Sequence, residues 1–189
     1  MSQYEIDGRP VPRVTEIIRD VLGGWFPSDP WYLERGTAVH DAMAAILRGK
    51  DFECDPRIQG FVDAGRKFLA DMPHKVVSVE GVVQSVMHQY CGRYDAVLGL
   101  VTPRISGSFI IDWKTNDADD ERVALQLGGY ALALGKAAPR YGMGVGLHED
   151  GTYKCTDVFD MRLKSREFAA LRVVWGIQDR LGQHKQDAS

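Results

Sequence analysis

Cysteine is scarce in this sequence, which has only three in 189 residues, at positions 54, 91 and 155. An odd count, wide spacing and the lack of a CxxC pair argue against both a disulfide framework and a cysteine-based zinc site. We therefore expect reduced thiols that are mostly packed inside the protein.

Long apolar runs and an excess of positive charge are missing as well. No apolar run is long enough to cross a membrane, and no basic and apolar leader opens the chain, so we expect a cytoplasmic protein without a membrane partner. The formal net charge of −3 excludes a global attraction to nucleic acid. A polyanionic partner would have to be held by a local basic patch or by metal ions.

The composition is otherwise that of an ordinary soluble domain. With 44% apolar and 26% charged residues, a chain of 189 residues can bury one proper core. We interpret the chain as a single domain with an N-terminal helical segment (1–72), a core (73–160) and a C-terminal helical segment (161–189).

The hydrophobic periodicity predicts helices first, then a mostly antiparallel sheet crossed by one helix, then a hairpin and a last helix. The expected helices cover residues 15–22, 33–49, 55–69, 119–136 and 165–181. The expected strands cover residues 75–86, 89–100, a segment ending at 112, and a hairpin over 141–159. The aromatic stretch 25–32, WFPSDPWY, is expected to be a loop. This order predicts an α/β fold with a central mixed sheet and helices on both faces.

The segment 107–116, GSFIIDWKTN, places an acid and a base at the end of a strand. Residues two apart in a strand point to the same face and lie roughly 6 to 7 Å apart. Asp112 and Lys114 should therefore stand side by side, with Ile111 and Trp113 on the opposite face. They form either a simple ion pair or two parts of one active site.

Three more side chains are placed where they could join Asp112. His40 lies in the middle of a predicted helix, Glu80 lies on the first long strand, and Asp95 lies on the second. Carboxylates and an imidazole can hold one or two hard divalent cations, and Mg²⁺ or Mn²⁺ suits such oxygen-rich ligands. The alternative interpretations are a packed histidine at position 40 and an ordinary ion pair for Glu80.

The helix after the third strand carries Gln126 and Tyr130 four residues apart, so they share one face. Both can hydrogen-bond a phosphate or position Lys114, and both could equally be ordinary surface and core residues. Gly128 and Gly129 lie between them and cost helix stability, which indicates that something approaches the backbone closely.

Two arginines are candidates for contacts with phosphate. Arg93 lies two residues before Asp95 and should point to the same face of the strand. Arg35 lies near the start of the helix that carries His40. The alternative is that both guanidinium groups are simply solvated.

Five short motifs occur in a fixed order: RGTAVH (35–40), VEGVV (79–83), GRYDAV (92–97), IIDWKT (110–115) and QLGGY (126–130). Together they resemble the PD-(D/E)XK nuclease superfamily, and most of all its RecB-like exonuclease branch, which includes phage-encoded members. The resemblance covers about residues 33–134 and implies a restriction-endonuclease-like core.

Carried over residue by residue, the resemblance implies a role for most of the side chains described above. The implied metal ligands are His40, Asp95, Asp112 and the main-chain carbonyl of Trp113. The implied catalytic residues are Lys114, the catalytic lysine, with Asp95, Asp112, Gln126 and Tyr130. Glu80 matches an acid often found on the strand before the hairpin.

The resemblance implies a DNA exonuclease that uses Mg²⁺ or Mn²⁺ in phage or bacterial recombination, repair or processing. Its location would be the cytoplasm of a bacterial or phage-infected cell, and its partners would be DNA and a single-strand-annealing or recombination protein. Some relatives hold an iron–sulfur cluster with four cysteines, which a chain with three cannot do. The compact chain would act alone or as one subunit of an assembly.

Three other functions fit parts of the pattern. The same core could cut DNA internally as an endonuclease, or it could bind DNA without cutting it. A 2-His-1-carboxylate oxygenase is a further alternative, but one well-placed histidine and a lysine in the site fit phosphate chemistry better.

Overall fold

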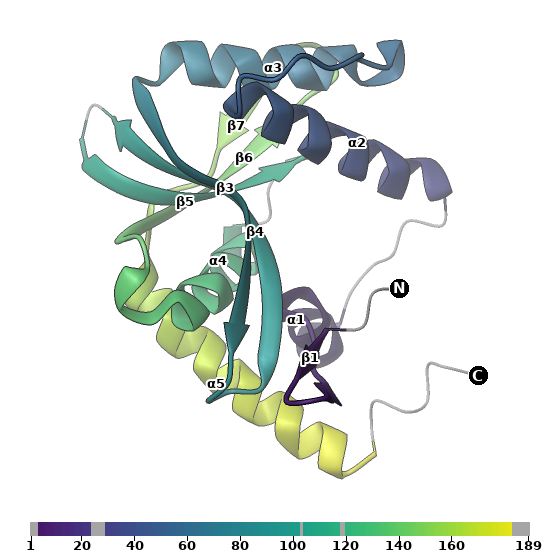
Figure 1. Cartoon of the computed structure of the whole chain (residues 1–189), viewed down its shortest axis with the longest axis vertical. Coiled ribbons are helices and arrows are strands. Elements are labelled where there is room, and N and C mark those ends of the chain that lie inside the picture. The colour runs from purple at the N-terminus through teal and green to yellow at the C-terminus, as the bar shows by residue number, and fades with distance from the viewer. Residues whose placement is uncertain (1–3, 24–28, 103, 118–119, 183–189) are drawn as a thin grey trace.

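A computed structural model describes residues 4–23, 29–102, 104–117 and 120–182 (Figure 1). The helices are α1 (Val14–Leu22), α2 (Pro30–Leu47), α3 (Gln59–Asp71), α4 (Asp120–Leu134) and α5 (Met161–Arg180), with short 3-10 helices η1 (Pro56–Ile58) and η2 (Gly135–Ala137). The strands are β1 (Glu5–Ile6), β2 (Arg9–Pro10), β3 (His74–Ser85), β4 (Tyr90–Val101), β5 (Ser106–Lys114), β6 (Tyr141–Leu147), β7 (Tyr153–Cys155) and β8 (Phe159–Asp160).

Within the described ranges, the main sheet has six strands in the order β3-β4-β5-β6-β7, with β8 paired to β6. The pairs are antiparallel except for β5 and β6, which run parallel from Phe109↔Tyr141 to Lys114↔Gly146. A parallel pair needs a crossover connection, and α4 provides it. The predicted mixed sheet crossed by one helix is therefore confirmed.

The strand β5 separates two hydrophobic cores because its side chains alternate between the faces of the sheet. Phe109, Ile111 and Trp113 pack with α2 and α3 in the first core, whereas Ile110 packs with α1, α4 and α5 in the second. Figure 1 shows the same division, with α2 and α3 on one side of the sheet and α4 and α5 on the other. The predicted fold class, with helices on both faces, is correct.

Two helices begin earlier than the periodicity predicted. The helix α2 begins at Pro30 rather than at 33, because the Asp29 side chain accepts a hydrogen bond from the backbone N–H of Trp31, and proline suits the first turn. Residues 30–32 of the expected aromatic loop are therefore helical, and residues 24–28 of the chain lie outside the described ranges. Asp160 caps α5 in the same way, and this helix begins at Met161, four residues before the expected start.

The close approach expected at Gly128 and Gly129 is made by the helices of the second core. A Cβ atom at Gly128 would overlap the backbone carbonyl of Lys164, and one at Gly129 would crowd Val14 and Phe168. The hydroxyl of Tyr90 donates a 2.6 Å hydrogen bond to the carbonyl of Gly129. The glycines thus allow α4 to pack tightly, which fixes the position of the site residues that α4 carries.

The three cysteines are free thiols, and Cys91 is buried. In the described part of the chain, no helix has both the length and the apolar character needed to cross a bilayer.

Candidate active site

The candidate site lies where β4 and β5 part. The ladder between them runs from Val101↔Ser106 to Ala96↔Ile111, after which β5 continues beside β6 alone. At this point Oδ2 of Asp95 accepts a 2.8 Å hydrogen bond from the backbone N–H of Trp113. A side-chain carboxylate therefore takes the place of a strand partner and is fixed at the opening of the sheet.

His40, Glu80 and Asp95 form a group that can hold a cation. Each offers one ligand atom, and these atoms lie within 4.8 Å of one another. The Nδ1 atom of His40 is 3.0 Å from Oδ1 of Asp95. Neighbouring ligands of an octahedral cation with bonds of about 2.1 Å lie about 3 Å apart, so this spacing fits either a hydrogen bond or two ligands of one ion.

Asp112 contributes a further buried carboxylate near this group, although its oxygens are not among the ligand atoms that lie within 4.8 Å of one another. Its residue exposure is 1%. The Oδ2 atom lies 2.7 Å from Nζ of Lys114, with which it forms an ion pair. A carboxylate has more lone pairs than the contacts with Lys114 and Gln126 use, so the set of oxygen atoms and one imidazole fits Mg²⁺ or Mn²⁺.

The strand-end pair is tied to α4 through one amide group. Gln126 donates from Nε2 to Oδ1 of Asp112 at 2.6 Å, and its Oε1 atom accepts a hydrogen bond from Nζ of Lys114 at 3.1 Å. The hydroxyl of Tyr130 accepts from the same Nε2 at 3.0 Å. Asp112 and Lys114 therefore form both an ion pair and part of a larger cluster, and β5 extends to Lys114 instead of ending at Asp112.

Burial and neighbouring charges shift the pKa in opposite directions at three of these groups. Burial raises the pKa of Asp112, although the neighbouring Lys114 opposes this effect. Burial would lower the pKa of Lys114, but the carboxylate of Asp112 outweighs it, so the pKa is raised. His40 behaves like the lysine, because Asp95 offsets its burial and raises its pKa. The carboxylate of Asp112 therefore favours the ammonium form of Lys114.

Glu80, a member of this group, has an unusual backbone conformation. Its φ angle is 56°, in the left-handed region that favours glycine, although the residue lies within β3. Its carboxylate forms a 2.8 Å ion pair with Arg93, whose side chain is 55% exposed. Burial raises the pKa of Glu80, and Arg93 partly offsets the rise. The structure thus places Glu80 and Arg93 with Asp95.

We expect the variant Glu80→Gly to be more stable than Glu80→Gln by about 1 kcal/mol, because only glycine relieves the left-handed backbone. This order is the reverse of that expected at an ordinary strand position. Both variants should bind Mn²⁺ more weakly than the wild type. Urea unfolding and calorimetric titration with Mn²⁺ measure the two effects. Wild-type Mn²⁺ affinity in both variants would show that Glu80 serves only as the partner of Arg93.

Arg35 and Trp113 have structural contacts that the sequence did not reveal. Arg35 donates from one terminal nitrogen to the carbonyl and hydroxyl of Thr115, at 3.2 and 3.3 Å, and so holds the chain that follows Lys114. The ring of Trp113 is buried edge-on against Phe68, with 5.5 Å between the ring centroids. The role of its main-chain carbonyl as a ligand stays a prediction.

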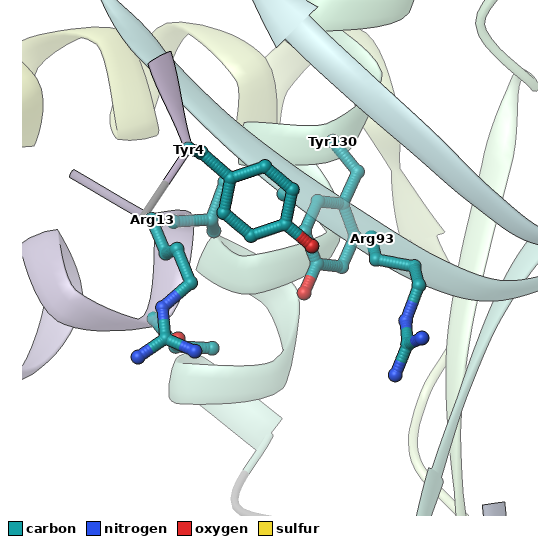
Figure 2. Close-up of a pocket in the computed structure, with 7 residues that line it drawn as sticks. Tyr4, Arg13, Arg93 and Tyr130 are labelled. Atoms are coloured by element: carbon teal, nitrogen blue, oxygen red, sulfur yellow. The ribbon is translucent and has the colours of Figure 1, made fainter. Parts of the chain in front are cut away.

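A polar pocket of about 300 Å³ adjoins the site (Figure 2). Its lining residues are Tyr4, Arg13, Val14, Thr15, Gly92, Arg93 and Tyr130. Figure 2 shows Arg13 and Arg93 on opposite sides, with the hydroxyls of Tyr4 and Tyr130 between them. Sequence reasoning missed Tyr4, Val14 and Thr15 as lining residues of this pocket. The only signal there was local: Arg13 and Glu16 have the spacing of a capping pair, and Glu16 accepts from the backbone N–H of Arg13 at 2.8 Å.

No protein-family model and no curated protein sequence matches the chain. Among solved structures, it is similar to LHK-Exo in complex with dAMP, with 13% identity, a TM-score of 0.40, and coverage of 93% of this chain and 92% of that one. It is also similar to the alkaline exonuclease LHK-Exo from Laribacter hongkongensis, with 12% identity, a TM-score of 0.38, and coverage of 91% and 93%. Both scores are too low for the likeness to bear on function.

Proposed function

We propose that this protein is a metal-dependent deoxyribonuclease that removes nucleotides from DNA ends. One observation carries the proposal: the cation-binding group of His40, Glu80 and Asp95 lies beside the buried Asp112–Lys114 pair, and the hydrogen bond from Trp113 to Asp95 links the two. A carboxylate-rich cation site next to a lysine provides the positive charge that stabilises the transition state of phosphodiester hydrolysis.

His40, Asp95 and Asp112 would hold Mg²⁺ or Mn²⁺, with Glu80 and the carbonyl of Trp113 as further candidates. When bound, the cation supplies charge that stabilises the phosphate in the transition state and lowers the pKa of water. A net-acidic chain can bind a polyanion in this way, because the cation inverts the local charge.

Lys114 would act as a charged donor to the oxygens of the scissile phosphate. The carboxylate of Asp112 raises the pKa of Lys114 and so favours the ammonium form, which can stabilise developing negative charge. Gln126 holds both Asp112 and Lys114 and thereby fixes the distance between the carboxylate and the ammonium group. Tyr130 in turn limits the rotation of the Gln126 amide.

The polar pocket of Figure 2 would receive a neighbouring phosphate of the same strand. The guanidinium groups of Arg13 and Arg93 can only donate hydrogen bonds, and the hydroxyls around them can also donate. Donors of this kind suit the oxygens of a phosphate. We assign the activity to phage or bacterial DNA recombination, repair or processing, with a single-strand-annealing or recombination protein as partner. This assignment is based only on the sequence order of the five motifs.

The proposal is tested by incubating the protein with linear duplex, closed-circular duplex and single-stranded DNA in Mg²⁺, Mn²⁺ or EDTA. We expect loss of linear DNA with either cation, intact circles, and no loss in EDTA. Cleavage of closed circles would make the protein an endonuclease. DNA binding without cleavage would make it a binding module, and neither binding nor cleavage would overturn the proposal.

A further inference from the structure

A second pocket, of about 220 Å³, lies between the starts of α2 and α3 and the turn after β6. Its lining residues are Trp31, Arg35, Arg57, Phe61 and Glu149. A Cβ atom at Gly60 would overlap the carbonyl of Glu149, so α3 and the turn are in direct backbone contact. Backbone packing, rather than flexible side chains, therefore sets the position of these walls.

Flat groups dominate the lining of this pocket. The guanidinium of Arg57 lies 4.1 Å from the ring centroid of Trp31, and Asp55 holds it with a 2.6 Å hydrogen bond. The guanidinium of Arg35 lies 5.0 Å from the ring centroid of Phe61. Two guanidinium planes and two aromatic rings thus meet at one concave surface. Such surfaces stack on the flat face of a nucleobase.

The pocket is coupled to the candidate active site through Arg35. The same side chain that lines the pocket donates to the carbonyl of Thr115, the residue after Lys114. A strand whose phosphate lies at Lys114 would therefore have a base within reach of this pocket.

We propose that the pocket formed by Trp31, Arg35, Arg57 and Phe61 holds an unpaired nucleobase of the strand being cut. The inference rests on the proposed function, because it takes the bound strand to be the nuclease substrate. Every base has a flat face, so the pocket accepts any base and selects for an unpaired one. The substrate is therefore a single strand, or a duplex end that has opened before the cut.

The test uses the Asp112→Asn protein, which should bind DNA without degrading it, and short single strands with 2-aminopurine at successive positions. We expect one position to show a change in 2-aminopurine fluorescence on binding. Trp31→Ala and Arg57→Lys, each added to Asp112→Asn, should remove this change and weaken binding about 5- to 150-fold. Arg57→Lys keeps the positive charge but removes the planar guanidinium group, so it separates stacking from electrostatic attraction.

Arg140→Lys is the matched control. Arg140 also pairs with an aspartate, Asp160 at 2.6 Å, and lies 5.9 Å from the ring centroid of Tyr141, at the other end of β6. It should leave both binding and fluorescence unchanged. Because Arg57 is exposed, Arg57→Lys reports on the pocket even where Trp31→Ala disturbs folding.

A fluorescence response that is the same at all positions, or that survives in Arg57→Lys, would overturn the inference. Failure of the proposed function looks different. In that case the wild type cuts no DNA with Mg²⁺ or Mn²⁺, while the position-specific response and its loss in Arg57→Lys are still observed and support the pocket. Cutting by the wild type without any position-specific response would overturn the pocket alone.

Discussion

Replacing Asp112 by asparagine or Lys114 by methionine should each lower kcat by about 10³-fold or more. Asp112 offers a buried carboxylate to the cation, and Lys114 offers the only ammonium group that the described contacts place against it. Asparagine can still accept the hydrogen bond from Gln126, so the loss would come from charge rather than from collapse of the cluster. Single-turnover cleavage of end-labelled linear DNA measures the effect.

The two variants should differ in their affinity for the cation. Asp112→Asn removes a proposed ligand and should weaken Mn²⁺ binding in a calorimetric titration, whereas Lys114→Met removes a competing positive charge and should not weaken it. The double variant removes both charges of a buried ion pair and should be at least as stable as the wild type. Full cleavage by purified Asp112→Asn protein, free of wild type, would sink the proposed mechanism.

Replacing Asp95 should abolish cleavage, and a comparison of two variants should separate its two roles, in cation binding and in the support of the sheet. Asp95 belongs to the group that can hold a cation, and it accepts the hydrogen bond from the backbone N–H of Trp113 at the opening of the sheet. Asp95→Ala loses both roles, whereas Asp95→Asn keeps an acceptor for Trp113. We expect both variants to be inactive, and the alanine variant to be less stable than the asparagine variant by about 1 to 3 kcal/mol, the cost of an unpaired buried N–H.

Urea unfolding of the two Asp95 variants, beside cleavage of linear DNA, checks this second prediction. Ser108→Ala is a suitable control because Ser108 is an exposed residue of β5 away from the opening of the sheet. It should change neither quantity. Equal stability of Asp95→Ala and Asp95→Asn would show that the contact with Trp113 does not support the sheet.

The local parts of the site could be predicted from the sequence because they depend on spacing along one element. Asp112 and Lys114 share a face of β5 because strand side chains alternate, and their side chains are indeed in contact. Gln126 and Tyr130 share a face of α4 because they are four residues apart, and they are hydrogen-bonded. In both cases the period of the element fixes the geometry.

The parts that could not be predicted depend on contacts between distant segments. The hydrogen bond from Arg35 to Thr115 spans 80 residues, and nothing near Arg35 indicates it. The backbone of Pro12 accepts from Cys91, 79 residues away, and this contact brings the N-terminal segment to the polar pocket. The left-handed backbone conformation of Glu80 could not be predicted from the sequence either, because such positions usually hold glycine or asparagine.

The contact between His40 and Asp95 has a thermodynamic consequence. It joins α2 to β4 across 55 residues of chain, so a cation held there is bound only when the helical layer and the sheet are both in place. The binding free energy is then added to the folding free energy, by about 2.7 kcal/mol when the free cation is a hundred times its Kd. Under the proposed function, a cell that withholds the cation would leave the protein both inactive and easier for proteases to remove.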